Sequence, residues 1–159
     1  MTSTQTSSGG GIIALTVVIA MVLMILPLPE SIRLFRPEFV LLVLMYWVMA
    51  LPRKVSVGYA WIVGILVDIM MGSYLGVTAF SYALVIYLTA RFHLQLRQFP
   101  VWQQALIILS LVLIVHIVAV LVSPQIVNWY LWLPAISSMI VWPLNYALLR
   151  SVRRTFHIS

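Results

Sequence analysis

Long apolar runs alternate with short polar segments along the whole chain. Six such runs can be marked, and proline, glycine and basic residues lie between them. The runs are apolar on all sides and lack the amphipathic pattern of a water-soluble helix, and about 20 such residues span a bilayer. The pattern predicts an all-α integral membrane protein with one domain, 12–149, whose six transmembrane helices cover 12–28, 37–51, 55–71, 77–95, 104–122 and 131–149.

The second predicted helix is shorter than the others. Pro37 suits the first turn of a helix and Pro52 its end, which leaves 15 residues from 37 to 51, or roughly 22 Å. Tilt or local thinning of the bilayer can absorb such a mismatch. A re-entrant segment that does not cross the membrane is the competing topology.

The basic residues predict the orientation. Of the nine Lys and Arg, six spans with a cytoplasmic N-terminus place only Arg33 and Arg36 outside. The other seven are inside: Arg53, Lys54, Arg91, Arg97, Arg150, Arg153 and Arg154. The positive-inside rule therefore predicts two cytoplasmic tails, a flexible one at 1–11 and a basic one at 150–159. Aromatic residues at 129, 130 and 132 predict an outer interfacial belt, with Trp102 as its inner counterpart.

Composition removes several classes of function. Hydrophobic residues make up 64% of the chain and charged residues only 8%, which excludes a soluble domain of this size. There is no cysteine, so disulfides and thiolate metal sites are excluded. The basic residues lie singly or in small groups at the ends of apolar runs, so no nucleic-acid path is predicted. The first run lacks a cleavage site, and we expect it to be retained as a helix.

Small residues line one side of the third predicted helix. Ala60, Gly64, Asp68 and Gly72 recur every four residues and so share a face, and Gly76 follows in the next turn. In lipid, small residues let two helix backbones approach closely. We expect this helix to be the packing centre, with its small face against the fourth helix, although the face could instead be offered to a partner.

Asp68 is the most unusual residue of that face. It lies about one turn from the end of its helix, where the helix dipole disfavours an anion, so a nearby group must compensate its charge. Two donors are available, the guanidinium of Arg36 and the free amides at the start of the fourth helix. We predict a structural clamp that uses both. A proton relay or cation site is the alternative, but one carboxylate makes a poor cation cage.

Two further polar residues lie inside apolar helices. His116 is predicted to bond a hydroxyl on a neighbouring helix, such as Ser81, and Asn145 to make an interhelical hydrogen bond. A role as ligand or proton carrier is the alternative for His116. The sequence holds no paired acids and no hydrolase, metalloprotease or phosphate-loop motif, so no enzyme, metal or cofactor is predicted.

A set of residues between 35 and 88 has a distinctive spacing: Arg36-Pro37, Tyr46-Trp47, Pro52, Gly58, Gly64, Asp68, Gly72, Leu75-Gly76 and Tyr82. With these residues the segment resembles the MreD family of rod shape-determining proteins, and the likeness extends through 102–115 to the basic end. The resemblance implies a scaffold of the bacterial inner membrane without catalytic residues. It implies MreC as principal partner, with the MreB filament, RodA and its transpeptidase in the same elongation complex, surrounded by membrane lipid.

The family's six-helix fold is also similar to the substrate-binding components of energy-coupling-factor transporters. A small-molecule-binding transport subunit, for a vitamin or a lipid-linked substrate, is therefore the second hypothesis. Those components dock through an A-x-x-x-A face on helix one, whereas this chain has Ala14 and Ala20, six residues apart. Its predicted outer loops are short, which leaves little to cover a ligand.

Overall fold

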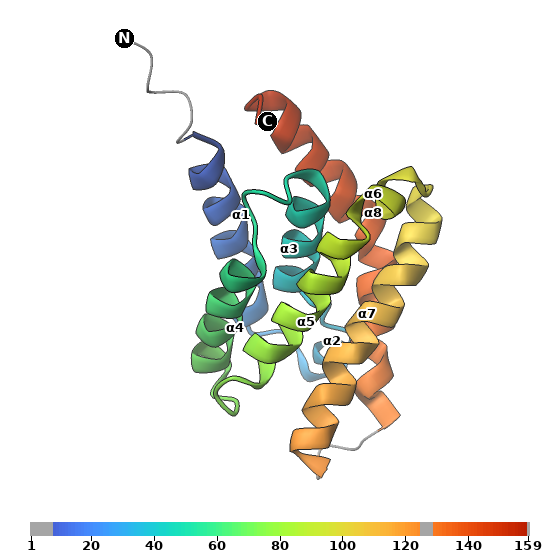
Figure 1. The fold of residues 1–159 in the computed structure, drawn as a ribbon. Coiled ribbons are helices and arrows are strands. Elements are labelled where there is room, and N and C mark those ends of the chain that lie inside the picture. The colour runs from blue at the N-terminus through green and yellow to red at the C-terminus, as the bar shows by residue number, and fades with distance from the viewer. Residues whose placement is uncertain (1–7, 125–128, 159) are drawn as a thin grey trace.

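The computed structural model describes residues 8–124 and 129–158. Within these ranges every regular element is helical (Figure 1). The elements are α1 (Ser8–Ile25), α2 (Glu30–Arg33), α3 (Phe39–Ala50), α4 (Val57–Met71), α5 (Val77–Arg91), α6 (His93–Gln98), α7 (Val101–Val122), the 3₁₀ turn η2 (Trp129–Trp132) and α8 (Leu133–Thr155). Most of the predicted N-terminal tail and the side chain of residue 129 in the predicted aromatic belt lie outside the described residues.

In the described part of the chain, six long helices (α1, α3, α4, α5, α7 and α8) form the bundle and run alternately in opposite directions, so the start of α1 and the end of α8 lie at the same end (Figure 1). Among the residues that the structure describes, two helical segments are long and apolar enough to cross a membrane, Val101–Val122 and Tyr130–Thr155. The other four apolar segments are shorter, at Gly9–Ile25, Phe39–Ala50, Val57–Met71 and Val77–Arg91.

The helix boundaries differ from the predicted ones for local reasons. Helix α1 ends at Ile25 and not at residue 28, because Pro27 disfavours helical backbone in the residue before it. The predicted helix 77–95 is divided at Phe92 into α5 and α6. Helix α7 begins directly after Pro100, and α8 continues to Thr155, so much of the predicted basic tail is helical.

The packing centre of the bundle is α3. The prediction that the third predicted helix, 55–71, which corresponds to α4, is the packing centre was wrong. Every residue from Val40 to Met49 is buried, and α3 contacts α1, α5, α6 and α8. Helix α4 buries only one side. At 1.5 Å per residue α3 is roughly 18 Å long. Because helices facing lipid are as apolar as helices facing protein, the hydrophobic pattern alone did not identify the central one.

Two buried polar ties connect the helices inside the bundle. The indole Nε1 of Trp47 donates to Thr16 Oγ1 at 2.9 Å, which joins α3 to α1. The amide nitrogen of Gln104 donates to the carbonyl of Leu96 at 2.9 Å, and its oxygen accepts from Trp142 Nε1 at 3.3 Å. These bonds satisfy polar groups that would otherwise be costly to bury.

Candidate functional site

The α4–α5 pair forms the first part of the site. Gly64 lies against the backbone of α5, where a Cβ atom added to it would be 2.4 Å from the Cα and 2.8 Å from the N of Ala79. No side chain fits at that distance. Three residues of the predicted small face are buried residues of α4: Ala60, Gly64 and Asp68.

The last two glycines of the predicted face have another role, in the turn between the two helices. Gly72 ends α4 with φ of 64°, and Gly76 precedes α5 with φ of 95°. Both angles lie in the left-handed region, which glycine adopts without steric cost. The packing face therefore ends at Asp68, and the turn that follows brings the start of α5 back over the end of α4.

Asp68 is fully buried and its carboxylate is saturated by the turn and the start of α5. Oδ1 accepts from Ser73 Oγ at 2.8 Å and from the Thr78 amide at 3.2 Å. Oδ2 accepts from the amides of Gly76 at 2.9 Å and Ala79 at 3.4 Å. We call these five residues the Asp68 cap. The first amides of a helix have no partner within it and carry its positive dipole end, so they compensate an anion.

Arg36 is not part of this cap. Its guanidinium donates to the carbonyls of Met24 and, at 2.6 Å, of Leu26, at the end of α1. Among the described residues the ion pair is Arg33–Glu30, at 3.9 Å and largely exposed. The predicted Arg36–Asp68 contact is therefore absent from the described part of the chain. Arg36 satisfies carbonyls that have no intrahelical partner, which is a second structural tie at the same end of the bundle.

Glu38 is a site residue that the sequence analysis missed. Its Oε2 accepts from the Tyr82 hydroxyl at 3.1 Å, and its backbone amide donates to Ser138 Oγ at 3.0 Å. Tyr82 and Ser138 are fully buried, so Glu38 joins α3 to α5 and α8. It is one of only three acids and directly precedes an apolar run. The reasoning that an acid beside apolar helices needs a nearby donor, which we used for Asp68, applies equally to Glu38.

Replacing Tyr82 with phenylalanine is expected to lower the free energy of unfolding by about 1–2 kcal/mol. This is near the low end for a hydrogen bond to a charged group, because half-buried Glu38 retains contact with water. Thermal unfolding in mild detergent measures the loss. Tyr87→Phe, on the exposed side of the same helix, is the control and should have no effect beyond about 0.5 kcal/mol. Equal losses in the two variants would contradict the Glu38 bond.

The two predicted interior contacts are not formed within the described residues. Ser81 Oγ donates to the Val77 carbonyl of its own helix at 2.8 Å and not to His116. His116 Nε2 and Asn145 Nδ2 are buried without a hydrogen-bond partner in the described part of the chain. The predicted His116–Ser81 bond is therefore wrong, since the hydroxyl satisfies itself locally.

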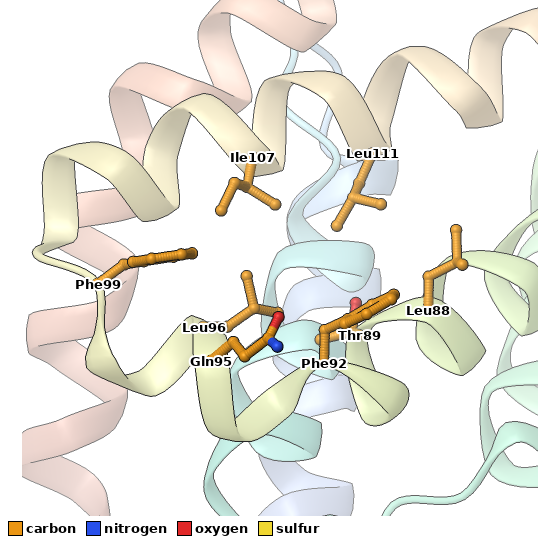
Figure 2. Close-up of a pocket in the computed structure, with 8 residues that line it drawn as sticks. All are labelled: Leu88, Thr89, Phe92, Gln95, Leu96, Phe99, Ile107 and Leu111. Carbon is orange, nitrogen blue, oxygen red and sulfur yellow. The ribbon is translucent and has the colours of Figure 1, made fainter.

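A metal site and a small-molecule site each place requirements on the described residues. The described ranges contain no group of three or more His, Asp or Glu placed to hold a metal ion. An apolar hollow of about 200 Å³ lies between α5, α6 and α7, with the rings of Phe92 and Phe99 on one side and Ile107 and Leu111 on the other (Figure 2). It is smaller than the usual range for small-molecule sites, which begins at about 300 Å³.

Comparisons with known proteins agree on one family. No solved structure matches the chain, so the similarity to energy-coupling-factor components stays a prediction. The chain is 36% identical over 141 residues to the rod shape-determining protein MreD of Haemophilus influenzae, which covers 86% of this chain and 87% of that protein. The model of the family described as rod shape-determining protein MreD matches residues 7–152. These matches show that the chain belongs to the MreD family of rod shape-determining proteins.

Proposed function

We propose that this chain is a non-enzymatic scaffold of the bacterial inner membrane. In this proposal it binds MreC and helps to couple the MreB filament to peptidoglycan synthesis by RodA and its transpeptidase. The observation that carries the proposal is the state of Asp68. Its oxygens are occupied by a hydroxyl and three amides of the same chain, so it has no free lone pairs directed at a substrate or ion.

The proposal includes six membrane crossings with both termini in the cytoplasm. Seven basic residues lie in the segments at the end of the bundle where α1 begins and α8 ends, whereas Arg33 and Arg36 lie at the opposite end (Figure 1). The positive-inside rule favours this orientation. Exposed apolar side chains on the outer faces of the long helices are compatible with contact to lipid, and they include Leu15, Ile62, Leu121 and Ile140.

The surface that binds MreC must lie outside the α4–α5 seam. Gly64 and Ala60 are covered by the chain itself, so their small face is not available to another helix. A transmembrane helix of MreC would therefore pack on an outward face. Helices α1, α4, α7 and α8 present such faces, with side chains that are more than half exposed.

Photo-crosslinking in living cells tests this proposal. A crosslinking residue is placed in turn at the exposed positions Leu15, Ile62, Leu121 and Ile140, and at buried Ala60 as the control. We expect a covalent product with MreC from one outward face and none from Ala60. Purification in mild detergent should recover MreC and cell-wall synthases. A bound vitamin or an energising ATPase in place of MreC would contradict the scaffold and favour the transport subunit.

A further inference from the structure

Three arginines converge at the end of the bundle opposite the Asp68 cap. Arg97 of α6 and Arg150 and Arg153 of α8 line a hollow of about 230 Å³ together with Tyr46 and Tyr146. We call these five residues the basic hollow. Arg150 and Arg153 also line an adjoining depression of about 530 Å³, together with Arg154, His157 and Ile158. The positive charge is therefore concentrated around a concave surface between α3, α6 and α8.

No acidic side chain neutralises these arginines. The three acidic side chains are those of Glu30 on α2, Glu38 at the start of α3 and Asp68 near the end of α4, and these parts of the helices lie at the other end of the bundle (Figure 1). Glu30 pairs with Arg33, and the other two accept the hydrogen bonds described above. Within residues 8–124 and 129–158 these arginines therefore have no carboxylate beside them, and like charges held together repel each other, so the cluster creates a local potential that favours an anion.

The walls of the hollow are ordered by aromatic packing and by one hydrogen bond of Arg153. The rings of Tyr46 and Tyr146 meet edge to face with centroids 5.4 Å apart, and Tyr146 also lies 6.2 Å from the ring of Trp142. The Nε of half-buried Arg153 donates to the carbonyl of Ile158 at 3.4 Å. This contact orients the guanidinium, whose fork matches phosphate oxygens.

We propose that the basic hollow binds the phosphate headgroup of an anionic phospholipid. Three arginines and two phenols match a phosphodiester, and the apolar Met49 and Ala50 on the same wall suit the first carbons below it. Basic pockets between helices on the cytoplasmic side of a membrane commonly bind such headgroups. The assignment to the cytoplasmic leaflet rests on the proposed orientation, while lipid binding itself does not depend on MreC.

Thermal unfolding of the purified full chain in mild detergent tests the proposal. Phosphatidylglycerol is added as the probe, with zwitterionic phosphatidylcholine and inorganic phosphate as the two comparisons. We expect phosphatidylglycerol to raise the melting temperature at concentrations where the others have no effect. An equal rise with phosphatidylcholine, or with inorganic phosphate alone, would overturn the assignment to an anionic lipid.

A matched pair of triple variants separates this hollow from general surface charge. One variant removes its arginines, Arg97→Gln/Arg150→Gln/Arg153→Gln. The control removes three charges from the same end that line neither hollow, Arg53→Gln/Lys54→Gln/Arg91→Gln. Each arginine–phosphate bond contributes about tenfold or more to the affinity for the lipid. The first variant should therefore lose the rise in melting temperature that phosphatidylglycerol causes, and the control should keep it. Equal losses would contradict the site.

Native mass spectrometry of the unmodified chain provides a test that needs no variant to fold. In an equimolar mixture of phosphatidylglycerol and phosphatidylcholine, we expect retained adducts to be mainly phosphatidylglycerol. Equal retention of the two lipids would overturn the proposal. Because the assay contains the chain alone, a negative result here would leave the proposed MreC scaffold untouched, and loss of MreC crosslinks would leave this site untouched.

Discussion

Asp68→Ala is expected to lower the free energy of unfolding by about 3 kcal/mol or more, because three backbone amides lose their acceptor at once and each buried unpaired donor costs about 1–3 kcal/mol. Asp68→Asn should lose less. Its carbonyl oxygen can accept from Gly76 and Ala79, and its NH₂ group can donate to Ser73 Oγ. Thermal unfolding in mild detergent and the yield of monodisperse protein measure both variants.

The asparagine variant also distinguishes a structural role of Asp68 from a role in proton transfer. If Asp68 carried protons, Asp68→Asn would abolish rod shape in cells while leaving the yield of folded protein unchanged. Our account expects shape and yield to fall together in Asp68→Ala and to be partly retained together in Asp68→Asn. Retained yield with lost shape would contradict it.

Arg36 serves as the control for the Asp68 cap. Since its guanidinium bonds the end of α1 and not Asp68, the losses of Arg36→Ala and Asp68→Ala should add in the double variant to within about 0.5 kcal/mol. This reverses the expectation from sequence, in which a shared clamp implies a loss smaller than the sum. A loss in the double variant clearly smaller than the sum of the two single losses would contradict this and favour direct contact between Arg36 and Asp68.

Gly64→Ala is expected to give the second large effect. A Cβ atom 2.4 Å from the Cα of Ala79 is more than about 1 Å inside normal carbon contact, so α4 and α5 must separate. Overpacking of this kind costs about 3 kcal/mol, against a gain of about 1 kcal/mol from the better helix propensity of alanine. The variant should therefore lose about 2 kcal/mol in thermal unfolding.

Gly58→Ala is the matched control in the same helix. Its added Cβ would have Ser56 Oγ at 3.8 Å as its nearest neighbour, which is ordinary contact. Only the gain in helix propensity remains, so stability should be unchanged or rise by up to about 1 kcal/mol. If both glycine variants behaved alike, the close approach of α4 to α5 would be contradicted.

The helices could be predicted from the sequence, but their arrangement could not. Each predicted segment overlaps one helix of the bundle, except that 77–95 is divided into α5 and α6, because apolar runs and prolines act locally. The central position of α3 depends on which helices surround it, and an apolar pattern is the same whether it faces lipid or protein. The break at Phe92, which separates α6 from α5, likewise has no proline or glycine to mark it.

The amide contacts of Asp68 were predictable, because their donors are the first amides of the next helix in the sequence. The amides of α5 follow Asp68 within about a dozen residues, so the turn dictates that they meet. Arg36 also bonds a residue close in sequence, Leu26, whereas Glu38 depends on Tyr82, which lies across the bundle. Charge and membrane depth made Arg36 a reasonable partner for Asp68, but the carbonyls at the end of α1 were nearer. Glu38 was missed because its partners, Tyr82 and Ser138, are distant from it in sequence.

Hydrogen exchange of individual amides tests the central claim most directly, since the first amides of a helix have no acceptor within it. In the unmodified chain the amides of Thr78 and Ala79 should exchange about tenfold to hundredfold more slowly than that of Trp102, whose helix lacks a side-chain cap. In Asp68→Ala this protection should disappear. Rapid exchange at Thr78 and Ala79 in the unmodified chain, or protection that survives Asp68→Ala, would contradict the account.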